Sequence, residues 1–215
     1  MLTNNIIICI VSVIMNDLYD LSNLINKYTT ELKGVFTINE LKTLFNDFNE
    51  VALFRKINKL VKKNILSNFC RGFYIAQNFD IEQLSSKINE ASYISFGNIL
   101  AKELIISSIP KYTLMCIKLG KNRVYKYSNY KIIYLSIAQH LFFGFETIKG
   151  INYALKEKAF LDTLYFYQKG YKFFFNIYQD INIKLLNINL VYSFLKKYKN
   201  SKFIIFVKRY IDERI

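Results

Sequence analysis

The stretch that decides the fold is NEVALFRKINKLVKKN, residues 49–64. At about 100° per residue, its larger apolar side chains gather on one half of a helix. They are Val51, Leu53, Phe54, Ile57, Leu60 and Val61, with Ile65 directly after the stretch. Ala52 shares the opposite arc, roughly 120° wide, with a run of cations that contains no acid. These cations are Arg55, Lys56, Lys59, Lys62 and Lys63. The pattern predicts a helix that buries one side in a core and offers the other to an anion.

A second helix is predicted immediately before this one. In TINE, residues 37–40, Thr37 is a good N-cap, and Glu40 stands three residues later at the spacing of a capping box. That helix would run to about Asn46, and a short break at residues 47–49 leads into the quoted stretch. Two helices joined by a tight turn form a helix-turn-helix. Apolar residues at helical spacing predict one further helix upstream, over residues 17–30.

A hairpin is predicted directly after the cationic helix. The stretch ILSNFCRGFYIA, residues 65–76, alternates as two short strands, 65–69 and 73–76, with Arg71 and Gly72 in the turn between them. A hairpin in this position is a wing. The order of three helices and a hairpin predicts a winged helix-turn-helix domain over residues 16–78.

The chain from residue 81 onward predicts a second domain, mixed α/β, over residues 81–215. Strand-like runs cover residues 113–119, 123–127 and 130–135, with turns at Gly120 and Asn129. Helical patterns cover five further segments of this domain: residues 81–88, 95–105, 151–168, 173–179 and 183–199. The expected fold class of the whole chain is therefore α+β. The aromatic-rich segment 163–179 indicates core packing, or a surface through which copies of the chain associate on DNA. Both interpretations are favoured over a platform for base stacking.

The composition points to an anionic partner. A chain of 215 residues with 52% hydrophobic content can bury a sizeable core, and its formal charge of +14 favours nucleic acid, an anionic membrane surface or an acidic protein. Because 25 of the 30 cations are lysine, codon bias accounts for part of that charge.

Most of the excess charge lies in the second domain, where residues 81–215 carry 21 cations and 9 acids. An acid-free block there consists of Lys111, Lys118, Lys121, Arg123, Lys126 and Lys131. It could extend a DNA footprint, touch RNA or a nucleotide, or simply face water.

The sequence offers no catalytic or metal-binding constellation. Its three cysteines include no C-x-x-C pair, which fits a reducing cytoplasm and no zinc site. His140 is the only histidine, so a buried or helix-end residue is expected rather than a general base. Glu157 and Asp162 would lie about 140° apart on a helix, whereas Lys158 and Asp162, four residues apart, would form a structural ion pair. We therefore predict no catalytic residue, no metal and no cofactor.

The first residues do not predict a membrane span or a leader. The opening run of about ten apolar residues is too short to cross a bilayer and has neither a basic leader nor a small-residue cleavage site. Two interpretations stay open: translation that begins at Met15, or a real N-terminal strand or helix. Nothing later in the sequence is typical of a transmembrane segment.

In a helix-turn-helix, the first turns of the second helix reach base edges while other cations hold phosphates. This division assigns base or groove contact to Asn49, Ala52, Arg55 and Lys56. Phosphate contact falls to Lys59, Lys62, Lys63 and Arg71. The alternative for all of these cations is a solvated helix face.

Several phrases resemble the AbiEi-type antitoxins of abortive-infection, type IV toxin–antitoxin systems. They are RGFYI, YISFGNILAKELI, IPKYTLMCIKLGKNRVYKY and INYALKEKAFLDTLY. The family's run A-x-P-E-K-A-L-L-D corresponds to Ala154, Glu157, Lys158, Ala159, Phe160, Leu161 and Asp162. The resemblance spans residues 17–170; Lys156 stands where the family has proline, and the chain beyond Gly170 does not align.

The resemblance implies a winged-helix autorepressor followed by an antitoxin domain. Such a protein binds double-stranded operator DNA upstream of its own operon. It counteracts a nucleotidyltransferase-like toxin encoded next door, without forming a stable complex with that toxin.

Three other functions stay open on the sequence. One is a transcription regulator with an effector-sensing second domain and no toxin partner. Another is a membrane-surface adaptor that uses its lysines and first fifteen residues, and the third is an enzyme, which no motif supports.

Overall fold

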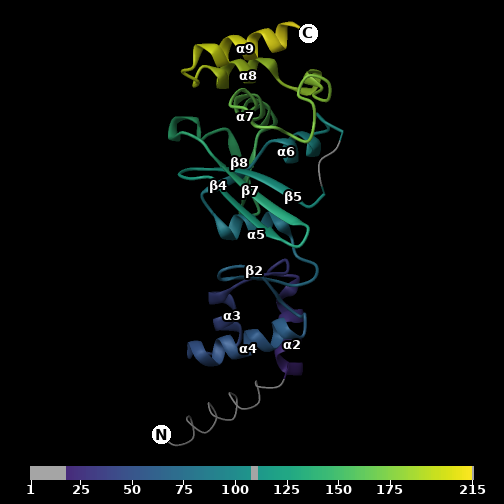
Figure 1. Cartoon of the computed structure of the whole chain (residues 1–215), viewed down its shortest axis with the longest axis vertical. Helices are drawn as coiled ribbons and strands as arrows, with labels where there is room; N and C mark the ends of the chain where they lie inside the picture. The colour runs from purple at the N-terminus through teal and green to yellow at the C-terminus, as the bar shows by residue number, and fades with distance from the viewer. Residues whose placement is uncertain (1–17, 108–110, 215) are drawn as a thin grey trace, which may run out of the picture. The chain divides into compact units, whose positions relative to one another are not determined.

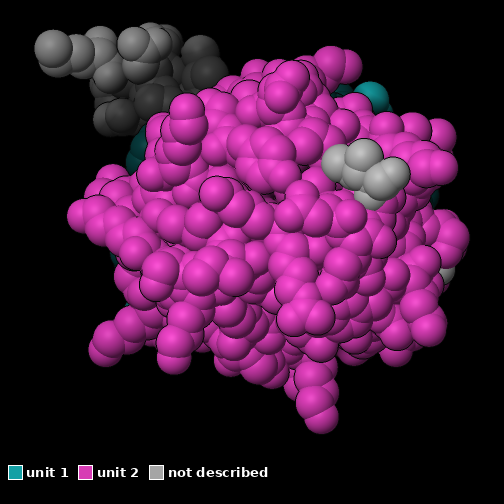
Figure 2. Space-filling model, turned by 90° about the horizontal axis from the view of Figure 1, so that it is seen from above, with its two compact units in different colours: residues 1–88 teal, residues 89–215 magenta. Residues whose placement is uncertain are grey.

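The computed structural model describes residues 18–107 and 111–214, so the expected start at Met15 lies outside the described residues. The chain is α+β and divides into two compact units, residues 1–88 and residues 89–215 (Figures 1 and 2). The second unit begins at residue 89, eight residues after the start at residue 81 that the sequence predicts for the second domain. Helix α5 (Ile81–Ile88) belongs to the first unit because Lys87 Nζ donates to Val35 O and pairs with Glu40 Oε1, both at 2.7 Å.

The described part of the first unit, residues 18–88, contains four helices and a three-stranded antiparallel sheet in the order β1-β3-β2. Its elements are, in chain order, α2 (Leu18–Thr29), β1 (Val35–Thr37), α3 (Ile38–Leu44), α4 (Glu50–Lys62), β2 (Ser67–Cys70), β3 (Phe73–Ile75) and α5. The three predicted helices and both hairpin strands are present, and each strand is one residue shorter than predicted. The sequence missed β1, a three-residue strand that pairs along the full length of β3.

Helix α3 begins as the sequence predicts. Thr37 is its N-cap: the Glu40 N–H donates to Thr37 Oγ1 at 3.2 Å, and the Thr37 N–H donates to Glu40 Oε2 at 2.7 Å. These two reciprocal bonds satisfy N–H groups that a helix start leaves without intrahelical partners. The capping box also fixes the point at which β1 ends.

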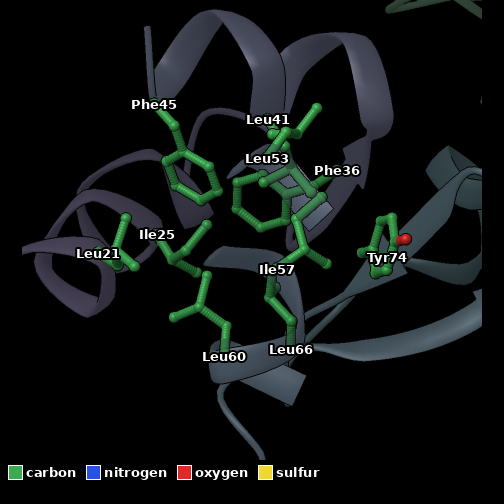
Figure 3. Packing of buried hydrophobic residues seen from close by; sticks show 10 residues of the cluster. All are labelled: Leu21, Ile25, Phe36, Leu41, Phe45, Leu53, Ile57, Leu60, Leu66 and Tyr74. Carbon is green, nitrogen blue, oxygen red and sulfur yellow. The ribbon is translucent and has the colours of Figure 1, made fainter. Parts of the chain in front are cut away.

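The core of the first unit is formed by side chains from its three N-terminal helices and its sheet (Figure 3). Its buried members are Leu21, Ile25, Phe36, Leu41, Phe45, Leu53, Ile57, Leu60, Leu66 and Tyr74. Three of them, Leu53, Ile57 and Leu60, lie at i, i+4 and i+7 on α4 and define the inner face of that helix. The orientation of α4 follows from this apolar stripe.

Gly34, directly before β1, lies close to the backbone that follows β3. Gly34 has a φ of +69°, and a Cβ at this position would lie 2.7 Å from the carbonyl oxygen of Asn78. Its carbonyl accepts the Ala76 N–H at 2.9 Å, just beyond the pairing of β1 with β3. Only glycine combines this backbone conformation with so close an approach.

The second unit is built on a six-stranded mixed sheet in the order β6-β7-β5-β4-β9-β8. The pairs β5–β7 and β4–β9 are parallel, and the other three are antiparallel. Its strands are β4 (Ser92–Ile94), β5 (Thr113–Lys118), β6 (Arg123–Tyr127), β7 (Tyr130–Ser136), β8 (Phe145–Ile148) and β9 (Ile151–Ala154). Its helices are α6 (Gly97–Lys102), α7 (Lys156–Gln168), α8 (Ile188–Leu195) and α9 (Ser201–Asp212), with 3-10 turns at Gln139–Leu141 and Ile183–Leu185.

Helix α7 is the central helix of this unit. It packs against α6, α8 and α9 and lies over the sheet face that carries Tyr93 (Figure 1). Because it is covered on several sides, nine of its thirteen residues are buried, including three that are charged. Its apolar residues therefore show no single stripe.

Sequence and structure agree for β5, β6 and β7, for α6 within the predicted helix 95–105 and for α7 within the predicted helix 151–168, and they differ elsewhere in this unit. Residues 151–154 form β9 rather than the first turn of a helix, and residues 173–179 contain no helix. The predicted helix 183–199 is a 3-10 turn followed by α8, while β4, β8 and α9 were not anticipated. Over residues 18–107 and 111–214, no helix has the length and apolar content needed to cross a membrane.

Candidate nucleic-acid interface

The turn between α3 and α4 is held by side-chain caps. Asn46 has a φ of +46°, and Asp47 Oδ1 accepts the Asn49 N–H at 3.2 Å. Asn49 is the N-cap of α4, and its Oδ1 accepts the N–H groups of Val51 at 2.9 Å and Ala52 at 3.2 Å. Asn49 was predicted to contact bases, but this oxygen is already engaged in starting the helix.

Lys56, predicted to make base or groove contact, does not belong to the exposed cationic face. Its side chain is only 8% exposed, and its Nζ pairs with Asp47 Oδ2 at 3.1 Å. An ammonium group at the edge of a core requires such a partner because burial without one is costly. Lys56 therefore ties the second turn of α4 to the turn that precedes the helix.

The outward face of α4 is rotated from its predicted position. Val51 and Phe54 were assigned to the core, yet they are 69% and 41% exposed. On a projection of 100° per residue, the buried residues of α4 centre on Leu60, which puts the exposed arc about 70° from the predicted one. The stripe Leu53, Ile57, Leu60 would have given the correct phase if it alone had been used.

We call the resulting exposed stripe the outer face of α4. It consists of Val51, Phe54, Arg55, Asn58, Lys59 and Lys62, which with Glu50 line a shallow open concavity. These positions lie at i, i+3, i+4, i+7, i+8 and i+11, so they form one continuous strip along the helix. Apolar side chains occupy its N-terminal half and lysines its C-terminal half. Val51, Phe54 and Asn58 were missed by the sequence analysis as outward residues.

The remaining predicted cations of the first unit are exposed. Lys63 is the C-cap of α4, and Arg71 lies in the turn between β2 and β3. In the described part of the chain, Arg55, Lys62, Lys63 and Arg71 take part in no ion pair. The hairpin turn is short, and its Gly72 carbonyl accepts the Ile38 N–H at 3.0 Å. Arg71 is thereby held beside the start of α3, while Ala52 is half-buried.

The predicted second basic surface is divided by the sheet. Side chains alternate between the two faces of a strand, and Lys126 lies opposite Lys131 while Arg123 lies opposite Tyr134. In the pairing of β5 with β7, Thr113 lies opposite Lys131, and Lys118 lies opposite Ser136. The register therefore puts Lys126 and Lys131 on one face and Lys118 and Arg123 on the other, with Lys111 and Lys121 outside the strands. The six cations do not form a single patch.

The charged residues of α7 form a buried cluster. Lys158 and Asp162 are both fully buried and form the predicted i, i+4 ion pair. Asp162 Oδ2 also accepts hydrogen bonds from Ser95 Oγ at 2.9 Å and Tyr93 Oη at 3.2 Å. Burial raises the pKa of Asp162 and lowers the pKa of Lys158, and the charge of each partner opposes that effect. Both side chains are closed off from solvent in this structure.

The other titratable residues singled out in the sequence, Glu157 and His140, lie in separate environments. Glu157 Oε1 accepts the Asn187 N–H at 3.0 Å and so anchors the start of α8 rather than meeting Asp162. His140 is exposed in the 3-10 turn at Gln139–Leu141. Across residues 18–107 and 111–214, no group of three His, Cys, Asp or Glu side chains is placed to hold a metal ion.

In comparisons with known proteins, no family model matches this chain and no curated protein matches it by sequence. The outer face of α4 is therefore interpreted from its own geometry and charge.

Proposed function

We propose that the first unit is a winged helix-turn-helix domain that binds double-stranded DNA with α4 in the major groove. The element order α2, β1, α3, α4, β2, β3 supports this proposal, as does the sheet order β1-β3-β2. The observation that carries it is the outer face of α4, where Arg55, Lys59 and Lys62 are exposed on a helix whose opposite side is fixed in a core. An α-helix with such a face fits the width of the major groove.

The side chains divide into two roles under this proposal. Arg55 lies in the second turn of α4 and is the cation best placed to donate two hydrogen bonds to a guanine edge. Lys59, Lys62, Lys63 and Arg71 are placed to neutralise phosphates. Asn49 contributes through the N-cap geometry, and its amide N–H₂ remains available at the helix start.

By its resemblance to AbiEi-type antitoxins, we further propose that the protein is a cytoplasmic autorepressor and antitoxin. Its partner would be a neighbouring nucleotidyltransferase-like toxin, which it counteracts without a stable complex. The run ALKEKAFLD, residues 154–162, supplies the buried core of α7. The second unit would then present the antitoxin surface on that core.

The test of DNA binding is a gel-shift series with the DNA upstream of the protein's own gene. Arg55→Ala is expected to weaken binding by about 1–3 kcal/mol and to relax sequence preference. Lys62→Ala is expected to weaken binding to all sequences and to reduce the slope of log K against log salt by about 1. Unchanged affinity in either variant would reject the role assigned to that residue.

The antitoxin role has a separate test, which is growth after co-expression with the neighbouring gene. Full-length protein should restore growth, and a chain without residues 89–215 should not. If the neighbouring gene encodes no nucleotidyltransferase fold, the antitoxin role fails, and an effector-sensing regulator becomes the better interpretation.

A further inference from the structure

We propose that α4 selects A·T base pairs by placing Val51 and Phe54 against thymine methyl groups. This inference rests on the proposed DNA binding and adds the base preference that the exposed apolar residues of α4 encode. It is carried by their exposure of 69% and 41% in the first two turns of the helix.

These two exposed apolar side chains lie three residues apart on the same face of α4. The core of the first unit is already closed by Leu53, Ile57 and Leu60 on the opposite side of α4. Val51 and Phe54 add nothing to that core and leave apolar area in contact with water. A contiguous apolar patch rimmed by charge is typical of a binding surface.

The order of residue types along the outer face matches a helix in the major groove. The N-terminal turns of a recognition helix contact base edges, and its later turns lie nearer the backbone. Val51 and Phe54 occupy the first two turns, and Lys59 and Lys62 occupy the last two. The apolar end would therefore meet bases while the cationic end meets phosphates.

The chemistry of the groove then identifies the base. The thymine C5-methyl is the apolar group that base edges present in the major groove, and adenine presents the N6 and N7 pair that an amide can bind. Asn58 lies seven residues, or about two helical turns, after Val51 and is exposed on the same outer face of α4. Two apolar contacts and one amide fit adjacent A·T pairs.

Charge favours DNA over a second copy of the chain on this face. Arg55, Lys59 and Lys62 flank the apolar pair, and Glu50 is the only acid lining the same concavity. Two copies facing each other would bring these cations together without compensating acids, which disfavours association. A duplex brings phosphates to both sides of the same strip.

The experiment begins with selection of binding sites from random-sequence duplexes by the full-length chain. One selected duplex is then synthesised twice, with thymine or with uracil, which pairs identically but lacks the C5-methyl. The wild-type protein is expected to bind the uracil duplex about fourfold more weakly for each methyl contacted. The selected sites should be rich in A·T pairs.

Matched variants separate methyl contact from general affinity. Val51→Ala and Phe54→Ala should weaken binding to the thymine duplex and reduce the thymine-to-uracil ratio toward one. Lys62→Ala is the control, because it should weaken both duplexes equally and leave the ratio unchanged. Circular dichroism checks folding, and size-exclusion chromatography checks the oligomeric state of each variant.

The outcomes distinguish this inference from the proposed function. Salt-dependent binding with equal affinity for both duplexes would overturn methyl recognition and leave DNA binding intact. Absence of any selected duplex at low salt would overturn both. A change of oligomeric state in Val51→Ala, without a change in the ratio, would identify the patch as an interface between copies and reject the inference.

Discussion

At the scale of single residues, Lys56 shows how one ion pair changes the meaning of a charge run. Five cations in nine positions suggested a common face, yet Lys56 pairs with Asp47, which lies outside the helix. The pair explains why the outer face contains Arg55, Lys59 and Lys62 without Lys56. A helical projection in the phase of Leu53, Ile57 and Leu60 puts Lys56 on the inner side. It cannot identify the partner of Lys56, because Asp47 comes from the preceding turn.

The first prediction concerns this pair. Lys56→Ala leaves Asp47, whose side chain is 13% exposed, without its cation, so the free energy of unfolding should fall by about 1–3 kcal/mol. Urea denaturation measures this change. Lys63→Ala removes an exposed cation from the same helix and should change stability by less than about 0.5 kcal/mol.

The same variants give opposite results for DNA binding. Lys63→Ala should reduce the salt slope of DNA binding, and Lys56→Ala, assayed where it is folded, should leave that slope unchanged. A reduced slope in Lys56→Ala would contradict its assignment as a positioning residue.

At the scale of elements, one carboxylate joins three of them. Glu40 closes the capping box of α3 through Thr37, at the end of β1, and pairs with Lys87 of α5 at 2.7 Å. Burial alone would raise the pKa of Glu40. The hydrogen bonds from Lys87 and Thr37 outweigh burial, so the pKa of Glu40 lies below its usual 4.5.

The second prediction follows from the sign of that shift. A carboxyl group with a lowered folded pKa stabilises the fold at pH above its unfolded value, and this contribution is lost as pH falls through the folded value. The free energy of unfolding should therefore decline below about pH 4.5. The decline should be smaller in Glu40→Gln than in the wild-type protein. Urea denaturation at several pH values measures it.

Lys87→Met provides the matched variant for this prediction. It removes the cation and leaves the capping box in place, so it should reduce the same pH dependence while α3 remains capped. If Glu40→Gln and wild type decline equally with acid, other carboxylates dominate the acid response.

At the scale of the whole molecule, charge is distributed unequally between the two units. Residues 1–88 carry 10 cations and 8 acids, whereas residues 89–215 carry 20 cations and 8 acids. Most of the net positive charge therefore lies outside the proposed recognition helix. The register of the second unit's sheet divides the cations on its strands between two faces. Only one of these faces is therefore expected to add to a DNA footprint.

The third prediction identifies that face as the one with Lys126 and Lys131. These two lysines are directly opposed across β6 and β7 and take part in no ion pair within the described residues, which is unfavourable without a bound anion. The double variant Lys126→Gln and Lys131→Gln should lower the salt slope of DNA binding by about 2. The control pair is Lys118→Gln and Arg123→Gln, which should leave it unchanged.

An equal slope in both double variants would show that these cations face water. β6 is an edge strand, and lysines on such a strand also prevent pairing with other chains. Light scattering of the Lys126→Gln and Lys131→Gln variant reports on that role independently of DNA.

The sequence predicted features that depend on neighbours along the chain. The capping box at Thr37, the turn at Gly72 and the strand alternation of β5, β6 and β7 are local patterns, and the structure has them. The strands β1, β4, β8 and β9 have three or four residues each and are defined by distant partners. Such short strands carry too little alternation to be recognised by themselves, and β2 and β3, which are equally short, were found through the turn at Arg71 and Gly72 between them.

The sequence predicted which helix carries the candidate site. It did not predict which side of that helix faces outward. The cationic run identified α4, but Val51 and Phe54 were assigned inward because they are apolar. Hydrophobicity gives the direction of a helix only as an average over many positions. The residues that depart from that average are the ones to which we assign base recognition.

The Asp47–Lys56 pair also separates the framework of the first unit from its specificity. It restrains α4 from rolling about its axis, so the residues at positions 51, 54, 55 and 58 can vary without altering how the helix is seated. Under the proposed DNA binding, new target preferences can thus arise in descendants of this gene one substitution at a time. Loss of either member of the pair would instead act on the fold, by lowering the free energy of unfolding of the first unit, whichever sequence is bound.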